Sequence, residues 1–217
     1  MKKNKIINGG EEDFEFRQDN TSSWITESII QTALQERDIH VRGMITPETS
    51  YFVNRMFTKL RQIDLLRGVG YPITISLNTE GGFLSSTFSI ISKMREFQKM
   101  GYIIKTTTTD IAMSCGALIL MCGTKGYRSA QEFSEIMYHQ PSTVSLFKQT
   151  YEDSLRDTEE FGKLWNKIRE LTIEYTLIKD EWLVDEIQKR NVEKYLWANE
   201  AIELGIIDFI VGFEGAG

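Results

Sequence analysis

Cysteine and histidine are scarce in this sequence, and their scarcity excludes several kinds of site. Only two cysteines and two histidines occur among the 217 residues, which is too few for the usual structural zinc sites. If Cys115 and Cys122 share a helix, they lie roughly 10 Å apart along its axis, too far for a disulfide bond. We therefore expect no metal, no other cofactor and no disulfide bond.

Long apolar runs and clusters of positive charge are also missing. The longest apolar run, Ala117 to Cys122, is too short to span a bilayer, and the polar start, Met1 to Asp13, lacks the apolar core of a secretory signal. The net charge is −6 and the basic residues are scattered, unlike the footprint of a nucleic-acid-binding protein. The composition predicts a cytoplasmic protein with neither membrane nor nucleic acid as a partner.

What is present predicts one α/β domain behind a polar arm. Residues 1–22 show no periodicity, which predicts a flexible amino-terminal arm, and residues 23–217 form the domain. Short β-branched runs alternate with segments of helical periodicity, so we expect a parallel sheet covered by helices. The expected strands are 38–45, 73–77, 102–109 and part of 128–138, and the expected helices are 23–35, 46–66, 83–98 and 114–122.

The longest periodic segment runs from Leu146 to Ile178 and carries an apolar stripe. A continuous helix of this span would be about 50 Å long, more than a compact domain of this size requires. We expect a projecting helical handle at about 142–180 that packs against another subunit. The stripe is interpreted as a packing surface rather than as a cofactor site.

Three separated motifs supply the parts of an acyl-transfer site. The turn Asn78–Gly82 follows a predicted buried strand, Ser114 begins a predicted helix, and His139 follows a predicted strand. A serine hydroxyl becomes a nucleophile when an imidazole accepts its proton, and the resulting oxyanion needs donors already in place. A glycine turn can offer such backbone N–H groups. The sequence predicts a serine hydrolase that brings Ser114 and His139 together.

Each of these residues also has a purely structural interpretation. Ser114 could serve only as a helix cap, and His139 could be an ordinary strand histidine, as His40 is expected to be. Cys115 offers a thiol as a rival nucleophile, but on a helical turn its side chain points roughly 100° away from that of Ser114. We expect Cys115 to contribute its backbone N–H instead.

The ordered combination of motifs resembles the proteolytic subunit family of the Clp protease, which has the crotonase-like α/β fold. The similarity extends from about residue 38 to 208. It is carried by Gly81-Gly82, Met113–Ala117, Met137–Pro141 and Ala198–Asp208. The resemblance implies that Ser114 is the nucleophile and His139 the general base. It also implies that the backbone N–H groups of Gly82 and Cys115 are the oxyanion donors.

The third catalytic position departs from the family pattern. Lys189 or Arg190 occupies the place where the family has an aspartate, and a basic side chain cannot stabilise a protonated histidine. Asp185, Asn191 and Glu193 are the alternative third members, and a catalytic pair with no third member is the other possibility.

The resemblance also implies an assembly. It predicts a homo-oligomeric heptameric ring, single or stacked as two, or a mixed ring with a relative. The segment 142–147 replaces a glycine-rich segment that, in the family, helps to pair two rings. The implied substrates are unfolded polypeptides or peptides, and the implied partner is an ATP-driven AAA+ unfoldase, because the sequence has no phosphate-binding loop of its own.

Two alternative functions follow from the same residues. The basic residues Lys189 and Arg190 favour a catalytically impaired structural subunit that assembles with an active relative. The broad fold group also contains acyl-CoA enzymes, which need neither the serine nor its histidine.

Overall fold

The computed structural model describes residues 27–68, 70–141, 151–190 and 192–212. The strands are β1 (Asp38–Ile45), β2 (Ile73–Gly82), β3 (Ile104–Met113), β4 (Arg128–Gln131), β5 (Glu135–Tyr138), β6 (Lys194–Trp197) and β7 (Phe209–Val211). The helices are α1 (Glu27–Glu36), α2 (Pro47–Arg67), α3 (Leu84–Lys99), α4 (Cys115–Met121), α5 (Tyr151–Tyr175), α6 (Asp180–Trp182), the π-helix η1 (Leu183–Gln188) and α7 (Ala198–Glu203). The predicted flexible arm, residues 1–22, lies outside these ranges.

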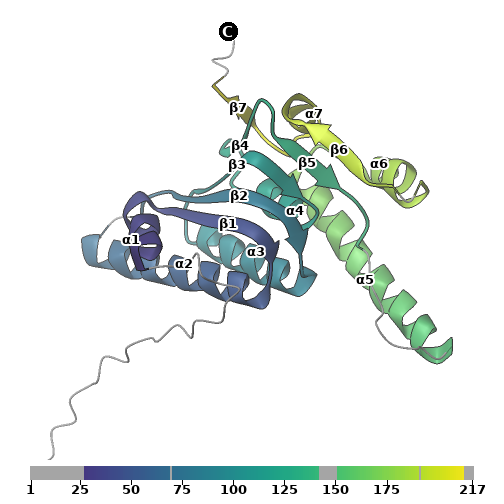
Figure 1. The fold of residues 1–217 in the computed structure, drawn as a ribbon, viewed down its shortest axis with the longest axis horizontal. Coiled ribbons are helices and arrows are strands. Elements are labelled where there is room, and N and C mark those ends of the chain that lie inside the picture. The colour runs from purple at the N-terminus through teal and green to yellow at the C-terminus, as the bar shows by residue number, and fades with distance from the viewer. Residues whose placement is uncertain (1–26, 69, 142–150, 191, 213–217) are drawn as a thin grey trace, which may run out of the picture.

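The sheet is mostly parallel, as predicted. Among the described residues its strand order is β1-β2-β3-β4-β7, with every neighbouring pair parallel. The helices α2, α3 and α4 supply the crossovers that parallel neighbours require (Figure 1). The strand β5 pairs in parallel with the end of β3 and antiparallel with β6. The α/β class is therefore confirmed, and one antiparallel pair is added that the periodicity did not indicate.

The helix α2 starts within a residue of its predicted place, and its ends are capped. Thr46 and Thr49 exchange hydrogen bonds at its start, and Pro47 is the first helical residue. Gly68 ends the helix with a φ of 69°, a left-handed conformation that costs glycine little. These caps set the length of the crossover that delivers β2 to the sheet.

The core lies between the sheet and its covering helices. The inward side chains of β2, Ile73, Ile75 and Leu77, are at most 2% exposed. Every residue of α4 is buried as well, and the Thr106 hydroxyl of β3 donates to the Leu120 carbonyl at 2.7 Å. Because buried elements are close-packed on all sides, the start of α4 is held in a fixed position.

The helix α5 projects from the sheet and confirms the predicted handle (Figure 1). Its 25 residues correspond to about 38 Å. It ends at Tyr175, three residues short of the predicted Ile178, because the Leu177 N–H leaves the helix and donates to the Leu204 carbonyl at 2.9 Å. The buried side chains Trp165, Ile168, Leu171 and Thr172 face the domain. Residues 142–150, at the predicted start of the handle, lie outside the described ranges.

Candidate active site

Three neighbouring strands deliver the three predicted motifs to one edge of the sheet. The strand β2 ends in Gly81 and Gly82, β3 ends directly before Ser114, and β5 ends directly before His139. The strand β3 lies between the other two and runs parallel to both. Carboxyl ends of parallel strands meet at one edge, which is where α/β folds place their sites. The topology therefore brings together residues that are remote in the sequence.

Ser114 is the single residue between β3 and α4. Its φ of 53° and ψ of −115° are unusual for a residue with a side chain, and such strained strand-to-helix turns are typical of nucleophilic serines. The Ser114 N–H donates to the Met137 carbonyl of β5 at 2.8 Å. That bond joins the turn to β5, the strand that directly precedes His139. It therefore fixes the position of Ser114 relative to His139.

The hydroxyl of Ser114 contacts the imidazole of His139. The distance from Ser114 Oγ to His139 Nε2 is 2.7 Å, a short hydrogen bond. Although Ser114 occupies the cap position of α4, its side chain makes no capping hydrogen bond there. The contact fits a neutral imidazole with its proton on Nδ1, in which Nε2 accepts the serine proton.

His139 is half-buried, and its surroundings act on its charge in two directions. Burial, the larger effect, lowers the pKa of the imidazole, and the negative charge of Glu193 opposes that change. The net result is a pKa below the ordinary value for histidine. The imidazole is therefore neutral, and able to accept a proton, over a wider pH range than a free histidine.

The two glycines of the β2 turn lie against the serine turn and against β1. A Cβ on Gly81 would lie 2.8 Å from Ser114 Cβ, and one on Gly82 would lie 2.4 Å from the Ile45 carbonyl oxygen. Their φ angles, 108° and 153°, are also ones that other residues rarely adopt. Only glycine lets this backbone approach Ser114 and Ile45 so closely.

Replacing Gly81 with alanine should therefore damage the site more than the fold. We expect Gly81→Ala to lower kcat/KM for a peptide substrate by about 100-fold, because the new methyl displaces Ser114 by a fraction of an ångström. Gly101→Ala is the matched control: its φ is 88°, but nothing lies within 4 Å of the added Cβ. Equal activity losses in the two variants would show that backbone strain, and not the approach to Ser114, is responsible.

The thiol of Cys115 is bonded to the backbone of the glycine turn. Its Sγ donates to the Gly82 carbonyl at 3.2 Å, and burial raises the pKa of the thiol, which keeps it protonated. A protonated, buried thiol is a poor nucleophile. The backbone of Cys115 remains beside Ser114, where the sequence motif predicted a donor.

A small pocket of about 80 Å³ lies beside the hydroxyl. Apolar side chains from four elements and the loop after β5 contribute to its wall. The lining residues are Gly82, Leu84, Ser114, Cys115, Leu118, Tyr138, His139, Pro141 and Ile168. Ile168 belongs to α5, and the Tyr138 hydroxyl is hydrogen-bonded to Thr172 of the same helix at 2.6 Å. The base of the handle is therefore part of the site.

The candidates for the third position lie in different places. Asp185 forms an exposed ion pair with Lys189 at 2.7 Å, so both side chains are engaged with each other on η1. Glu193 directly precedes β6, and its negative charge acts to raise the pKa of His139. Asn191 lies outside the described residues. Arg190 pairs with Glu186 at 3.2 Å.

The π-helix η1 was not predicted from the sequence. It closes with a bond from the Lys189 N–H to the Val184 carbonyl at 2.8 Å, five residues back instead of four. Such a turn accommodates one extra residue. The resemblance to the family carried one signal of it: the segment between His139 and the third position, at Lys189 or Arg190, is about one residue longer than in the family pattern.

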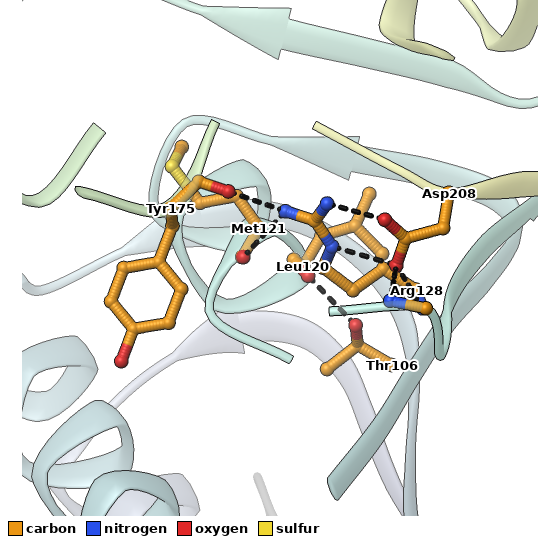
Figure 2. A network of polar contacts seen from close by, with 7 residues as sticks. Thr106, Leu120, Met121, Arg128, Tyr175 and Asp208 are labelled. Atoms are coloured by element: carbon orange, nitrogen blue, oxygen red, sulfur yellow. Dashed lines mark hydrogen bonds and ion pairs between the residues drawn. The ribbon is translucent and has the colours of Figure 1, made fainter. Parts of the chain in front are cut away.

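A buried ion pair behind α4 also escaped the sequence analysis (Figure 2). The guanidinium of Arg128 contacts the carboxylate of Asp208 through two nitrogens and donates to the carbonyls of Met121 and Tyr175 at 3.2 and 2.7 Å. The Gly126 N–H donates to the same carboxylate at 2.7 Å. One side chain therefore joins β4, the end of α4, the base of the handle and the segment before β7.

Two negative findings concern the described residues only. No group of three or more histidine, cysteine, aspartate or glutamate side chains is arranged there to hold a metal ion. None of the helices in the same ranges is long and apolar enough to cross a membrane.

Comparison with known proteins gives the class of this protein. The model of the Clp protease family matches residues 20–214, so the chain belongs to the Clp protease family. Membership implies a peptidase. The predicted resemblance is thereby confirmed over most of the chain.

The curated relatives are distant in sequence. The chain is 28% identical to ATP-dependent Clp protease proteolytic subunit 1 of Protochlamydia amoebophila over 65% of this chain and 66% of that protein. The protein of the same name from Chlamydia trachomatis is 26% identical over 76% of this chain and 82% of its own length. The protein of that name from Thermobifida fusca is 28% identical over 84% of this chain and 77% of its own length.

Proposed function

We propose that the chain is a serine endopeptidase, the proteolytic subunit of a Clp-like compartmentalised protease that cleaves unfolded polypeptides. The observation that carries this proposal is the 2.7 Å hydrogen bond between Ser114 Oγ and His139 Nε2. It lies beside a glycine turn that only glycine can form. Family membership adds support for the peptidase class.

In the proposed reaction Ser114 Oγ attacks the carbonyl carbon of the scissile peptide. His139 Nε2 accepts the serine proton as the bond forms and then gives it to the leaving amine, which releases the first product. Water, deprotonated by the same imidazole, attacks the acyl group on Ser114, and the imidazolium returns that proton to Ser114 Oγ as the bond to the second product breaks. Serine and histidine are thus restored at the end of the cycle.

The oxyanion of the tetrahedral intermediate requires donors that are already in place. We assign this role to the backbone N–H groups of Gly82 and Cys115: Cys115 follows Ser114 in the sequence, and Gly82 lines the same pocket. Removal of one such donor from a serine protease typically lowers kcat by 100- to 1000-fold. Because the backbone supplies both donors, neither depends on the identity of a neighbouring side chain.

The pH dependence of cleavage should follow the protonation of His139. Burial lowers the pKa of the imidazole, and only the neutral form accepts the serine proton. We therefore expect kcat/KM to fall on the acidic side with a midpoint below 6.5, the ordinary pKa of histidine. The profile is measured with a fluorogenic peptide, and circular dichroism at the lowest pH confirms that the fold persists. An acidic midpoint above about 7 would contradict the assigned environment.

The proposal includes an assembly in the cytoplasm. We infer a heptameric ring, single or stacked as two, or mixed with a relative, that receives its substrates from an AAA+ unfoldase. The projecting helix α5 supports this inference, because a helix that leaves its own domain needs another surface to cover it (Figure 1).

A second candidate function is a catalytically impaired subunit of a mixed ring. The observation that favours it is that, among the described contacts, the hydrogen bond of the His139 imidazole is the one to Ser114. No carboxylate is therefore seen to fix the ring from its other nitrogen. Purification of the chain alone separates the two functions. A homogeneous ring that hydrolyses an unstructured peptide supports the endopeptidase, and a folded ring without activity supports the impaired subunit.

A further inference from the structure

The residue directly before His139 is anchored to the handle by a buried hydrogen bond. Tyr138 is the last residue of β5, and its side chain is 1% exposed. Its hydroxyl lies 2.6 Å from Oγ1 of Thr172, a fully buried residue of α5 that is 34 positions further along the chain. The bond therefore joins the strand that ends before His139 to the base of the handle.

The neighbouring contacts decide which of the two hydroxyls donates. The single proton of the Thr172 hydroxyl goes to the Ile168 carbonyl, which lies 2.8 Å away and one helical turn back. Thr172 Oγ1 therefore accepts, and Tyr138 donates. Burial raises the pKa of the Tyr138 phenol, although the bond to Thr172 acts in the opposite direction, so the phenol keeps its proton. The bonds run in one direction, from Tyr138 through Thr172 to the Ile168 carbonyl.

These bonds connect two walls of the pocket beside Ser114. Tyr138 lines the pocket from β5, and Ile168 lines it from α5. An apolar contact between the strand and the helix would set only how closely they approach, because dispersion has no preferred direction. A hydrogen bond sets an angle as well as a distance. The end of β5 is therefore fixed in position and in orientation against the helix.

Tyr138 is also the buried anchor nearest to His139 among the contacts of the described residues. On one side, the Met137 carbonyl accepts from the Ser114 N–H at 2.8 Å. On the other side, the Gln140 amide donates to the Gln188 carbonyl at 3.2 Å, in an exposed contact. Because His139 follows Tyr138 directly, a shift of the tyrosine moves the imidazole with it.

We propose that Tyr138 and Thr172 are positioning residues for His139: the bond between their hydroxyls holds the end of β5 so that the imidazole stays 2.7 Å from Ser114 Oγ. The inference rests on the proposed function, in which that imidazole accepts the serine proton. Neither of the two buried hydroxyls contacts the substrate or takes part in the proton transfer. They act only through the position of the base, which must remain within hydrogen-bond reach of the serine.

Loss of this bond should lower kcat and leave KM nearly unchanged. A misplacement of 1 Å can cost about 100-fold in rate, and we expect a smaller movement here, so Tyr138→Phe and Thr172→Val should each lower kcat about tenfold. Phenylalanine and valine keep the shape of the side chains that they replace, so KM should change less than about twofold. The double variant should also be about tenfold slower, because all three proteins lack the same bond.

Stability should not follow activity in this series. Thr172→Val leaves the Tyr138 hydroxyl buried without a partner, so the melting temperature should fall by about 5 °C. Replacing both residues removes both polar groups, which is often nearly neutral for stability. The double variant should therefore melt close to the wild type and still be about tenfold slower. A purely structural role would predict that activity recovers together with stability.

Two controls come from the same helix. Thr172→Ser keeps the accepting hydroxyl and should keep the wild-type kcat. Thr176 lies one turn further on, where its hydroxyl donates to the Thr172 carbonyl at 2.7 Å and accepts from the Ile178 N–H at 3.1 Å. Neither of these partners belongs to β5. Thr176→Val should therefore lower the melting temperature and leave kcat unchanged.

The measurements are kcat and KM with a fluorogenic peptide, the melting temperature, and the rate at which a phosphonate labels Ser114. Light scattering checks that each variant has the assembly size of the wild type. The labelling rate should fall by the same factor as kcat, because it depends on the same imidazole.

Four results would overturn the inference. They are a wild-type kcat in both single variants, recovery of kcat in the double variant, an equal loss of kcat in Thr176→Val, and a change of assembly size that accounts for the loss. Failure of the proposed function is a separate result, since the wild-type chain would then show neither cleavage nor labelling of Ser114.

Discussion

Replacing Ser114 with alanine should lower kcat/KM for peptide cleavage by about 10⁶-fold, to the background rate. The hydroxyl is the group that forms the acyl intermediate, and loss of the nucleophile removes the covalent route altogether. The 2.7 Å contact with His139 would be lost with it. Activity is measured with a fluorogenic peptide and with an unfolded protein, at equal concentrations of assembled enzyme.

Two further variants make this prediction specific. Ser85→Ala removes an exposed serine from α3 and should leave activity unchanged. Combining Ser114→Ala with His139→Ala should cost no more than the single change, because the two residues act as one unit. A Ser114→Ala protein that retains substantial cleavage would require another nucleophile.

Replacing Arg128 with methionine should destabilise the fold by about 3–5 kcal/mol. The change removes the positive charge that faces the mostly buried carboxylate of Asp208, and it removes donors from the carbonyls of Met121 and Tyr175 (Figure 2). For a chain of this length the melting temperature should fall by about 10 °C. Thermal denaturation at one fixed protein concentration measures the shift, because assembly makes stability concentration-dependent.

The control for Arg128→Met is Arg95→Met. Arg95 also makes two bonds to a carboxylate, Glu174, but these side chains are 37% and 49% exposed. A surface pair of this kind is worth about 1 kcal/mol or less. Equal losses of stability in the two variants would show that burial of the Arg128 pair is not what matters.

The ion pair between Arg128 and Asp208 should make the stability of the fold depend on pH. Burial acts to raise the pKa of Asp208, but the hydrogen bonds and charge of Arg128 outweigh it and the net shift is downward. The carboxylate therefore contributes stability above its unfolded pKa, and that stability is lost as the pH falls through the lower folded value. Arg128→Met should reduce this acidic component of the stability profile, and the backbone N–H groups of Gly126 and residue 128 keep the remainder.

The position of the site could be predicted because it depends on parallel strands. The periodicities identified β2 and β3, the turn after each strand was visible as Gly81-Gly82 and Ser114, and sheet geometry then required a common edge. The start of α2 was equally visible in the sequence, at Thr46 and Pro47. These features are local, so the residues that determine them are neighbours in the sequence.

The features that escaped prediction depend on contacts between distant segments. The strands β5 and β6 have four residues each, too few for a clear alternation, and their antiparallel pairing joins segments that lie far apart in the sequence. Arg128 and Asp208 are 80 residues apart and neither belongs to a motif with a known spacing. No local pattern could have paired them.

The most direct test of the account is the rate at which a serine-directed phosphonate labels Ser114. Peptide mass spectrometry locates the adduct in the wild-type chain and in His139→Ala. The account predicts an adduct on Ser114 that forms about 10³-fold more slowly without the imidazole. Absence of an adduct from Ser114 in the wild-type chain, or equal rates in the two proteins, would contradict it.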